Sequence, residues 1–176
     1  MTRGCAAWGA LLCLVANGVA CAAPKGEGAV TVKLECVLGV DPQVRAGEPV
    51  MVRFRLTNRS KQRLFVLNWH TPLEGLLSGY LRVTRDGAEV PYQGPKVKRG
   101  DPEADEYVAL APGASADAEV EASLAYDFRP PGRYLLAFEG RLFDVAEKEA
   151  EVPRPLARHR AAAVRCPAVV TTVVAP

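Results

Sequence analysis

The sequence predicts an all-β fold, an antiparallel β-sandwich of roughly seven to nine strands. Two observations predict this fold. Apolar and polar residues alternate with a period of two in several short segments, and turn residues separate those segments at nearly regular intervals. In addition, no segment after the N-terminal apolar run keeps a helical period over three turns, and only 122–127 and 145–151 fit a turn or two of helix.

The first two strands are predicted at 30–36 and 50–57. Their sequences, VTVKLEC and VMVRFRLT, place apolar side chains on one face and polar side chains on the other. A turn around Gly47 separates the two segments, and a second turn at 58–60 leads into an apolar strand at 64–67. Cys36 falls on the apolar face of the first of these strands.

The next strands form a predicted hairpin at 80–84 and 88–92. Asp86-Gly87 lies between them, and this pair favours a tight turn because glycine adopts a positive φ at little cost. The polar stretch 93–106, rich in glycine, proline and charge, is expected to be a long surface loop. Further strands are predicted at 107–110 and 116–121, on either side of a turn at 111–113.

Gly132-Arg133-Tyr134 opens the next predicted strand, which ends at Phe138. A Gly-x-Tyr sequence at the start of a late strand resembles the tyrosine corner of immunoglobulin-like sandwiches, so the predicted sandwich is of that type. Residues 139–163 are expected to form a polar connector. The β-branched run 164–174 then favours a final strand.

The N-terminal segment 1–23 has the pattern of a secretory signal peptide. Arg3 precedes an uncharged apolar run that ends in small residues at Ala20–Ala23. The expected mature chain, 24–176, is a single β-sandwich domain with a polar connector near 140–163, secreted or periplasmic. An alternative is lipid anchoring at Cys21, which follows Ala20. No later segment reaches the ~18–20 apolar residues of a membrane span.

Removal of the signal peptide leaves two of the five cysteines, Cys36 and Cys166. An even number of cysteines in an exported chain predicts a disulfide between them. Two buried free thiols are the alternative.

Composition and motifs exclude several classes of function. The formal net charge is +2, with 22 basic and 20 acidic side chains, and no basic cluster predicts nucleic-acid binding. The sequence contains no His-Glu-x-x-His zinc motif, phosphate-binding loop or Gly-x-Ser-x-Gly nucleophile motif. We therefore expect no enzymatic activity, no cofactor and no metal. The acidic stretch 101–106 fits a solvated loop, with a calcium site as the alternative.

The segment LNWHTPLEG, Leu67–Gly75, is the densest group of unusual residues. It could be a structural corner anchored by Trp69, a partner-binding loop, or a metal site. Proline removes a donor needed for strand pairing, and tryptophan often anchors interfaces. The candidate binding residues are Trp69, His70, Thr71, Pro72, Leu73 and Glu74.

Several motifs occur in the order found in one known family. They are Trp69 with TPLEG at 71–75, VPYQG at 90–94, Lys98-Arg99-Gly100 and Tyr126-Asp127. With their surroundings, at about 56–138, they resemble the N-terminal, non-catalytic domain of bacterial lysine-specific metalloendopeptidases of the deuterolysin type. The chain has no counterpart of the zinc catalytic domain, so the resemblance carries over no catalytic residue. It departs from the pattern at His70, where asparagine is common.

The resemblance implies a secreted, non-enzymatic module similar to a protease propeptide. Its expected partner is a protein, a secreted zinc endopeptidase that it would inhibit or help to fold. The alternative is a structural or envelope-associated binding protein tethered through Cys21. A hydrolase would require a catalytic His70.

Overall fold

The computed structural model of the protein describes residues 33–176. The predicted signal peptide, the alternative lipidation site at Cys21 and the start of the first predicted strand lie outside the described residues. Within 33–176, no helix has the length and apolarity needed to cross a membrane.

The described chain is all-β, as predicted, and its helical turns are 3₁₀ turns of three residues each. Eight strands have four or more residues, within the predicted range: β1 (Leu34–Val40), β3 (Met51–Asn58), β4 (Leu64–Leu67), β5 (Leu81–Arg85), β7 (Tyr107–Leu110), β8 (Ser115–Glu121), β9 (Gly132–Phe138) and β13 (Val169–Val174). Five shorter strands are β2 (Gln43–Arg45), β6 (Ala88–Val90), β10 (Arg141–Leu142), β11 (Val145–Ala146) and β12 (Ala162–Ala163). The 3₁₀ turns are η1 (Pro72–Glu74), η2 (Ala104–Glu106), η3 (Ala122–Leu124), η4 (Glu149–Glu151) and η5 (Leu156–Arg158).

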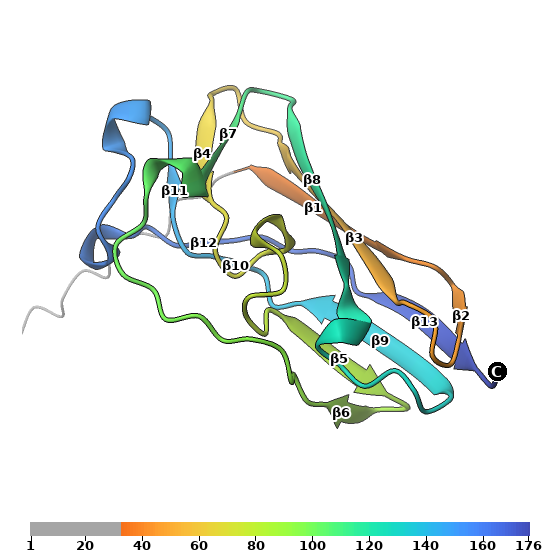
Figure 1. Ribbon diagram of the computed structural model, residues 1–176. Helices are drawn as coiled ribbons and strands as arrows, with labels where there is room; N and C mark the ends of the chain where they lie inside the picture. Colours follow the sequence, from red (N-terminus) through yellow and green to blue (C-terminus); the bar gives the residue numbers. More distant parts are fainter. Residues whose placement is uncertain (1–32) are drawn as a thin grey trace, which may run out of the picture.

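The strands form two principal layers. One layer contains the sheet β1-β3-β8, and the other contains the sheet β2-β13-β9-β5-β6. Figure 1 shows β1, β3 and β8 above β9, β5 and β6 of the larger sheet. The rings of Phe54 in β3 and Phe138 in β9 meet between the layers, with their centroids 5.5 Å apart. Two smaller sheets, β11-β4-β7 and β10-β12, extend the sandwich at one end.

One strand pair departs from the antiparallel pattern that the sequence predicted. β13 pairs in parallel with β2, with Val173 opposite Val44. After β1 the chain crosses from the three-stranded sheet to the edge of the five-stranded sheet, where it meets the last strand running in the same direction.

Tyr134 forms the predicted tyrosine corner. Its side chain is fully buried, and its hydroxyl donates to the carbonyl oxygen of Pro130 at 2.7 Å. Gly132 opens this strand with φ 153°, and a Cβ there would lie 2.6 Å from the Asp86 carboxylate. Glycine is therefore required where β9 passes the Asp86-Gly87 hairpin turn.

Strand β4 is buried on both faces. Leu64 and Val66 belong to the main core between the layers. Phe65 and Leu67 point to the other side, into a second apolar cluster with Trp69, Tyr107 and Ala146. The segment 139–163, which its polarity predicted to be a connector, extends the sheet that contains β4 and also covers its second face. β11 pairs with β4, and the amide of Leu67 donates to the carbonyl oxygen of Asp144 at 3.0 Å. Ala146 belongs to the second cluster, and Phe143 and Val152 pack against it.

An ion pair inside the covering segment is buried as well. Asp144 is fully buried, and the side chain of Arg154 is 7% exposed. The carboxylate accepts from Arg154 Nη1 at 2.7 Å, from the Tyr107 hydroxyl at 2.7 Å and from the amide of Arg160 at 2.7 Å. Burial raises the pKa of Tyr107, and its hydrogen bond to Asp144 raises it further. Several partners therefore compensate the desolvation of Asp144.

The predicted disulfide is present between Cys36 and Cys166, which are 130 positions apart. Cys36 lies in β1, in the three-stranded sheet, and Cys166 lies just before β13, in the five-stranded sheet. The bond therefore ties the two layers together near both ends of the described chain.

Reduction of this disulfide should lower the melting temperature by at least several degrees. Chain-entropy estimates assign a crosslink over so long a loop about 5 kcal/mol, as an upper value, because it restricts the unfolded chain. Calorimetry of the oxidised and reduced proteins, with Cys36→Ser/Cys166→Ser as the matched variant, measures the difference. Equal melting temperatures would show that the crosslink does not stabilise the fold.

Candidate functional site

The segment 67–75 forms a tight corner at the end of β4. The amide of Asn68 still donates to the carbonyl oxygen of Glu106 at 2.9 Å, and the chain then turns at His70, which has φ 55°. Thr71 caps η1: its hydroxyl oxygen accepts from the amide of Leu73 at 3.2 Å and donates to the carbonyl oxygen of Asn68 at 2.6 Å. Pro72 suits the first position of η1 because its missing N–H would have no partner there.

Trp69 anchors this corner. Its side chain is 2% exposed and lies in the second apolar cluster. The indole Nε1 donates to Glu106 Oε1 at 2.7 Å, which satisfies the one polar group of the ring. The Arg99 guanidinium carbon lies 4.9 Å from the ring centroid, and the His159 ring contacts the indole edge with centroids 6.0 Å apart.

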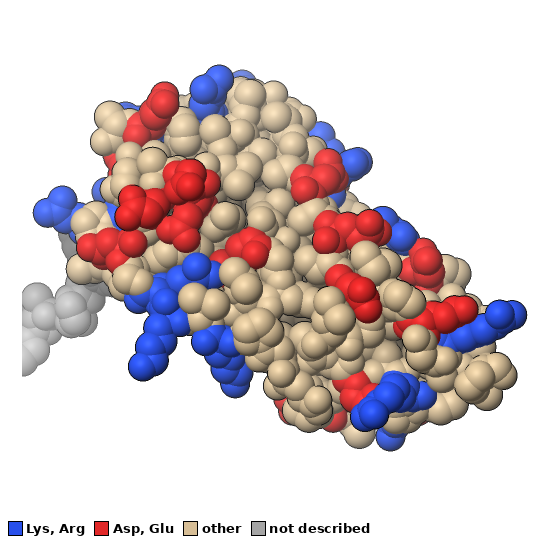
Figure 2. All heavy atoms as spheres, in the orientation of Figure 1, with Lys and Arg blue, Asp and Glu red and all other residues tan. Residues whose placement is uncertain are grey.

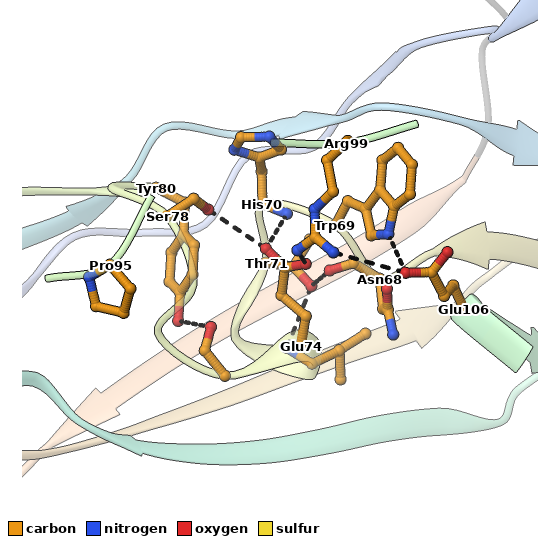
Figure 3. Close-up of polar contacts among 12 residues, drawn as sticks. Asn68, Trp69, His70, Thr71, Glu74, Ser78, Tyr80, Pro95, Arg99 and Glu106 are labelled. Atoms are coloured by element: carbon orange, nitrogen blue, oxygen red, sulfur yellow. Dashed lines mark hydrogen bonds and ion pairs between the residues drawn. The ribbon is translucent and has the colours of Figure 1, made fainter. Parts of the chain in front are cut away.

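Glu74 is the polar centre of the corner. Its side chain is only 4% exposed, and its carboxylate forms a salt bridge with Arg99. Oε1 also accepts from the amide of His70 at 2.7 Å and from the Ser78 hydroxyl at 3.3 Å. Figure 3 shows Arg99 lying between Glu74 and Trp69, where it also approaches Glu106 to 3.6 Å. Arg99 thus links η1 to the loop that follows β6.

His70 lies at the outer side of the corner. Its ring stacks on Phe143 with centroids 4.3 Å apart and an interplanar angle of 20°, and the Arg141 guanidinium lies 5.0 Å from the centroid of Phe143. Burial lowers the pKa of His70, and the charges of Arg99 and Arg141 lower it further, against the opposing effect of Glu74. Near neutral pH the imidazole is therefore uncharged.

The six residues selected from the sequence all lie in this corner. Trp69, Thr71 and Pro72 are buried, whereas His70, Leu73 and Glu74 are partly buried as whole residues, although the Glu74 side chain is only 4% exposed. Their contacts agree with the structural-corner interpretation, and binding through their exposed atoms stays a prediction.

Sequence reasoning did not select Arg99, Glu106, Ser78 or Phe143, all of which complete the corner. Arg99 belongs to the Lys98-Arg99-Gly100 motif, which was the one signal available for it. Its position in a polar loop, 25 residues after Glu74, gave no indication of a buried pairing.

The acidic stretch 101–106 is structured rather than open. Glu103 and Glu106 form a capping box at η2, and Asp101 accepts from the amide of Leu156 at 2.8 Å. Within residues 33–176 no three His, Cys, Asp or Glu side chains are grouped as metal ligands.

A separate groove lies on the outer face of the β1-β3-β8 sheet and shares no residue with the corner. Its volume is about 590 Å³. The cationic side chains that line it, Arg53 and Arg55, pair with Asp41 at 2.9 Å and Asp117 at 2.5 Å.

Comparison with known proteins relates the chain to proteases. It is 32% identical over 108 residues to an extracellular protease of Aeromonas hydrophila, a match that covers 58% of this chain and 31% of that protein. It is 30% identical over 105 residues to a probable neutral protease 2 homolog of Arthroderma benhamiae, which covers 58% of this chain and 28% of that protein. A neutral protease 2 homolog of Arthroderma gypseum is 27% identical over 103 residues. No protein-family model matches the chain.

The fold and these similarities together define a disulfide-linked β-sandwich that is related to proteases over more than half of its length. The chain spans only about a third of the length of the proteases that it matches.

Arg99→Ala should lower the free energy of unfolding by about 3 kcal/mol, because it leaves the buried Glu74 carboxylate without its counter-charge. Urea denaturation measures this loss. The control is Arg53→Ala, which removes an exposed ion pair and should cost far less. The double variant Glu74→Gln/Arg99→Met should recover part of the loss. Equal losses for Arg99→Ala and Arg53→Ala would contradict the central position given to Arg99.

His70→Asn should reduce the loss of stability in acid. A histidine whose folded pKa is lowered contributes stability above its ordinary pKa near 6.5, and this contribution is lost as the pH falls toward the folded pKa. Asparagine does not titrate and tolerates the left-handed backbone at this position. Melting temperatures of both proteins between pH 8 and pH 5 should converge or cross as the pH falls. A constant difference would show that His70 does not titrate in this range.

Proposed function

We propose that the chain is a secreted, non-enzymatic module that binds a zinc endopeptidase, in the manner of the N-terminal, propeptide-like domain of deuterolysin-type enzymes. The observation that carries this proposal is the similarity of 58% of the chain to an extracellular protease and to neutral protease 2 homologs. The order of motifs between 56 and 138 supports the same assignment.

The state of the reactive groups supports a non-enzymatic role. Cys36 and Cys166 are joined, so neither offers a thiolate. His70 stacks on Phe143, and the carboxylates of Glu74 and Glu106 are engaged by Arg99 and Trp69. These groups hold the corner together and leave little capacity for proton transfer to a substrate.

The disulfide supports an extracellular location. Such bonds form and persist in oxidising compartments, and the predicted signal peptide at 1–23 is the means of export. In that setting the module would meet secreted proteases after both chains have left the cytoplasm.

The test uses the oxidised mature domain, 24–176, as bait for the secreted proteins of its own organism. We expect it to capture a zinc endopeptidase and to reduce the activity of that enzyme, or to raise the yield of active enzyme on refolding. The matched control is bait that carries Cys36→Ser/Cys166→Ser. Because this variant lacks the disulfide, it tests whether capture requires the folded, crosslinked module. Capture of envelope components alone, together with an acylated Cys21 in the intact mass of the protein isolated from its own organism, would replace the proposal with the tethered alternative.

A further inference from the structure

One face of the molecule carries a cationic half beside an acidic half. The cationic half consists of Lys96 and Lys98, from the loop after β6, and Arg141 in β10; all three are exposed. The acidic half consists of Asp101, Glu103 and Asp105, at and before η2, and these are exposed as well. Figure 2 shows a group of basic side chains directly below a group of acidic ones at the end of the molecule where η2 lies. We call these six residues the charged face.

The positive charges of the cationic half are not paired within the chain. Within residues 33–176, Lys96, Lys98 and Arg141 form no ion pair, unlike Arg53, Arg55 and Arg59, which each pair with a carboxylate on the surface. The carboxylates of Glu74 and Glu106 pair with Arg99, the residue next to Lys98 in the same loop. Three positive charges are therefore available to an external group.

An aromatic stack lies within the cationic half. The Arg141 guanidinium lies over the Phe143 ring, which in turn stacks on His70. Phe143 and His70 are partly exposed, and Val97, between the two lysines, is 44% exposed. Apolar surface between cationic groups is the composition that favours protein interfaces, where aromatic and arginine side chains supply most of the binding energy.

The adjacent acidic half favours a protein partner over nucleic acid or an anionic bilayer. Nucleic acid and anionic bilayers present long, uniform rows of negative charge, which Asp101, Glu103 and Asp105 would repel. The small formal net charge of +2 gives no long-range attraction to offset that repulsion. A protein surface can instead place carboxylates against the lysines and basic groups against η2, so complementary charges fix its orientation.

We propose that the charged face is an interaction surface that docks an acidic segment of a partner protein against Lys96, Lys98 and Arg141, with an apolar or aromatic side chain of that segment on Phe143 and His70. This inference deepens the proposed function. It rests on the proposed function for one point, that the partner is a protein. It places the contact on the outer side of the corner, while the buried Trp69, Thr71 and Pro72 hold that surface in position.

The test uses the mature oxidised domain, labelled with ¹⁵N, and a short synthetic peptide of alternating glutamate and tyrosine as the probe. We expect the probe to shift the amide resonances of 96–99, His70 and 141–143 at low ionic strength, and the shifts to fade at high ionic strength. Lys96→Glu/Lys98→Glu/Arg141→Glu should weaken binding by at least about tenfold.

The matched control is Arg82→Glu/Arg133→Glu/Arg165→Glu. It changes the net charge by the same amount at exposed arginines that lie elsewhere and form no ion pair among the described residues. This variant should retain most of the binding. Equal weakening by both triple variants, or shifts spread over the whole surface, would reduce the effect to net charge and overturn the proposal.

Two further probes separate other partners. A lysine–tyrosine peptide should leave 96–99 and 141–143 unshifted, and tighter binding of duplex DNA or phosphatidylserine vesicles than of the acidic peptide would overturn the protein-docking assignment. The peptide result is independent of the protease capture. If the acidic peptide binds at the charged face and no endopeptidase is captured, the proposed function fails while the interaction surface stands.

Discussion

All four residues of strand β4 are buried, and this two-sided burial constrains the whole end of the molecule where the candidate site lies. Leu64 and Val66 face the core between the layers, as in any sandwich strand. Phe65 and Leu67 face outward and need a second cover, which the segment 139–163 supplies. Burial of each large apolar side chain contributes roughly 1.5–3 kcal/mol, so covering this face gives a substantial part of the net stability.

The covering segment 139–163 is polar in composition, and its buried charged side chains form ion pairs and hydrogen bonds. Asp144 would be too costly to bury alone, but Arg154, Tyr107 and the amide of Arg160 surround its carboxylate. A second buried carboxylate is also paired: at the corner, Arg99 forms a salt bridge with Glu74. Trp69 contacts Arg99 and lies in the second cluster with Tyr107, whose hydroxyl donates to Asp144.

This arrangement separates the structural role of the corner from its proposed binding role. The buried atoms of Trp69, Thr71 and Glu74 form contacts within the chain, whereas the exposed atoms that could meet a partner belong to His70, Phe143 and the basic loop beside them. A surface that docks a partner must be held rigid if the cost of ordering it on binding is to stay small. Arg99 pairs with Glu74 and Arg154 pairs with Asp144 within the chain, so neither ion pair has to form on binding.

Features encoded by local sequence were predictable. The period-two alternation of 50–57 predicted β3, Asp86-Gly87 predicted the β5–β6 hairpin, and Gly132-x-Tyr134 predicted a tyrosine whose hydroxyl bonds back to Pro130. The pairing of Cys36 with Cys166 followed from counting the cysteines that remain in a chain predicted to be exported. Each of these signals lies within a few residues or rests on a simple count.

Features that depend on contacts distant in sequence were not predictable. The apolar run 64–67 indicated a strand, but nothing in it showed which segment would cover its second face. Polarity predicted a connector at 139–163 because a buried, paired Asp144 and an exposed, solvated one look the same in sequence. Arg99 and the parallel β2–β13 pair escaped prediction for the same reason, since tertiary structure alone brings their partners together.

Hydrogen exchange of Asp144→Asn, followed by mass spectrometry, tests most directly whether the second face of β4 holds this end of the molecule together. The cover and the corner should open as one unit, so exchange should rise together in 64–75 and 143–160, while β3 and β9 keep their protection. Faster exchange confined to 143–160, with 64–75 unchanged, would contradict this coupling and would show that the Trp69 corner stands without its cover.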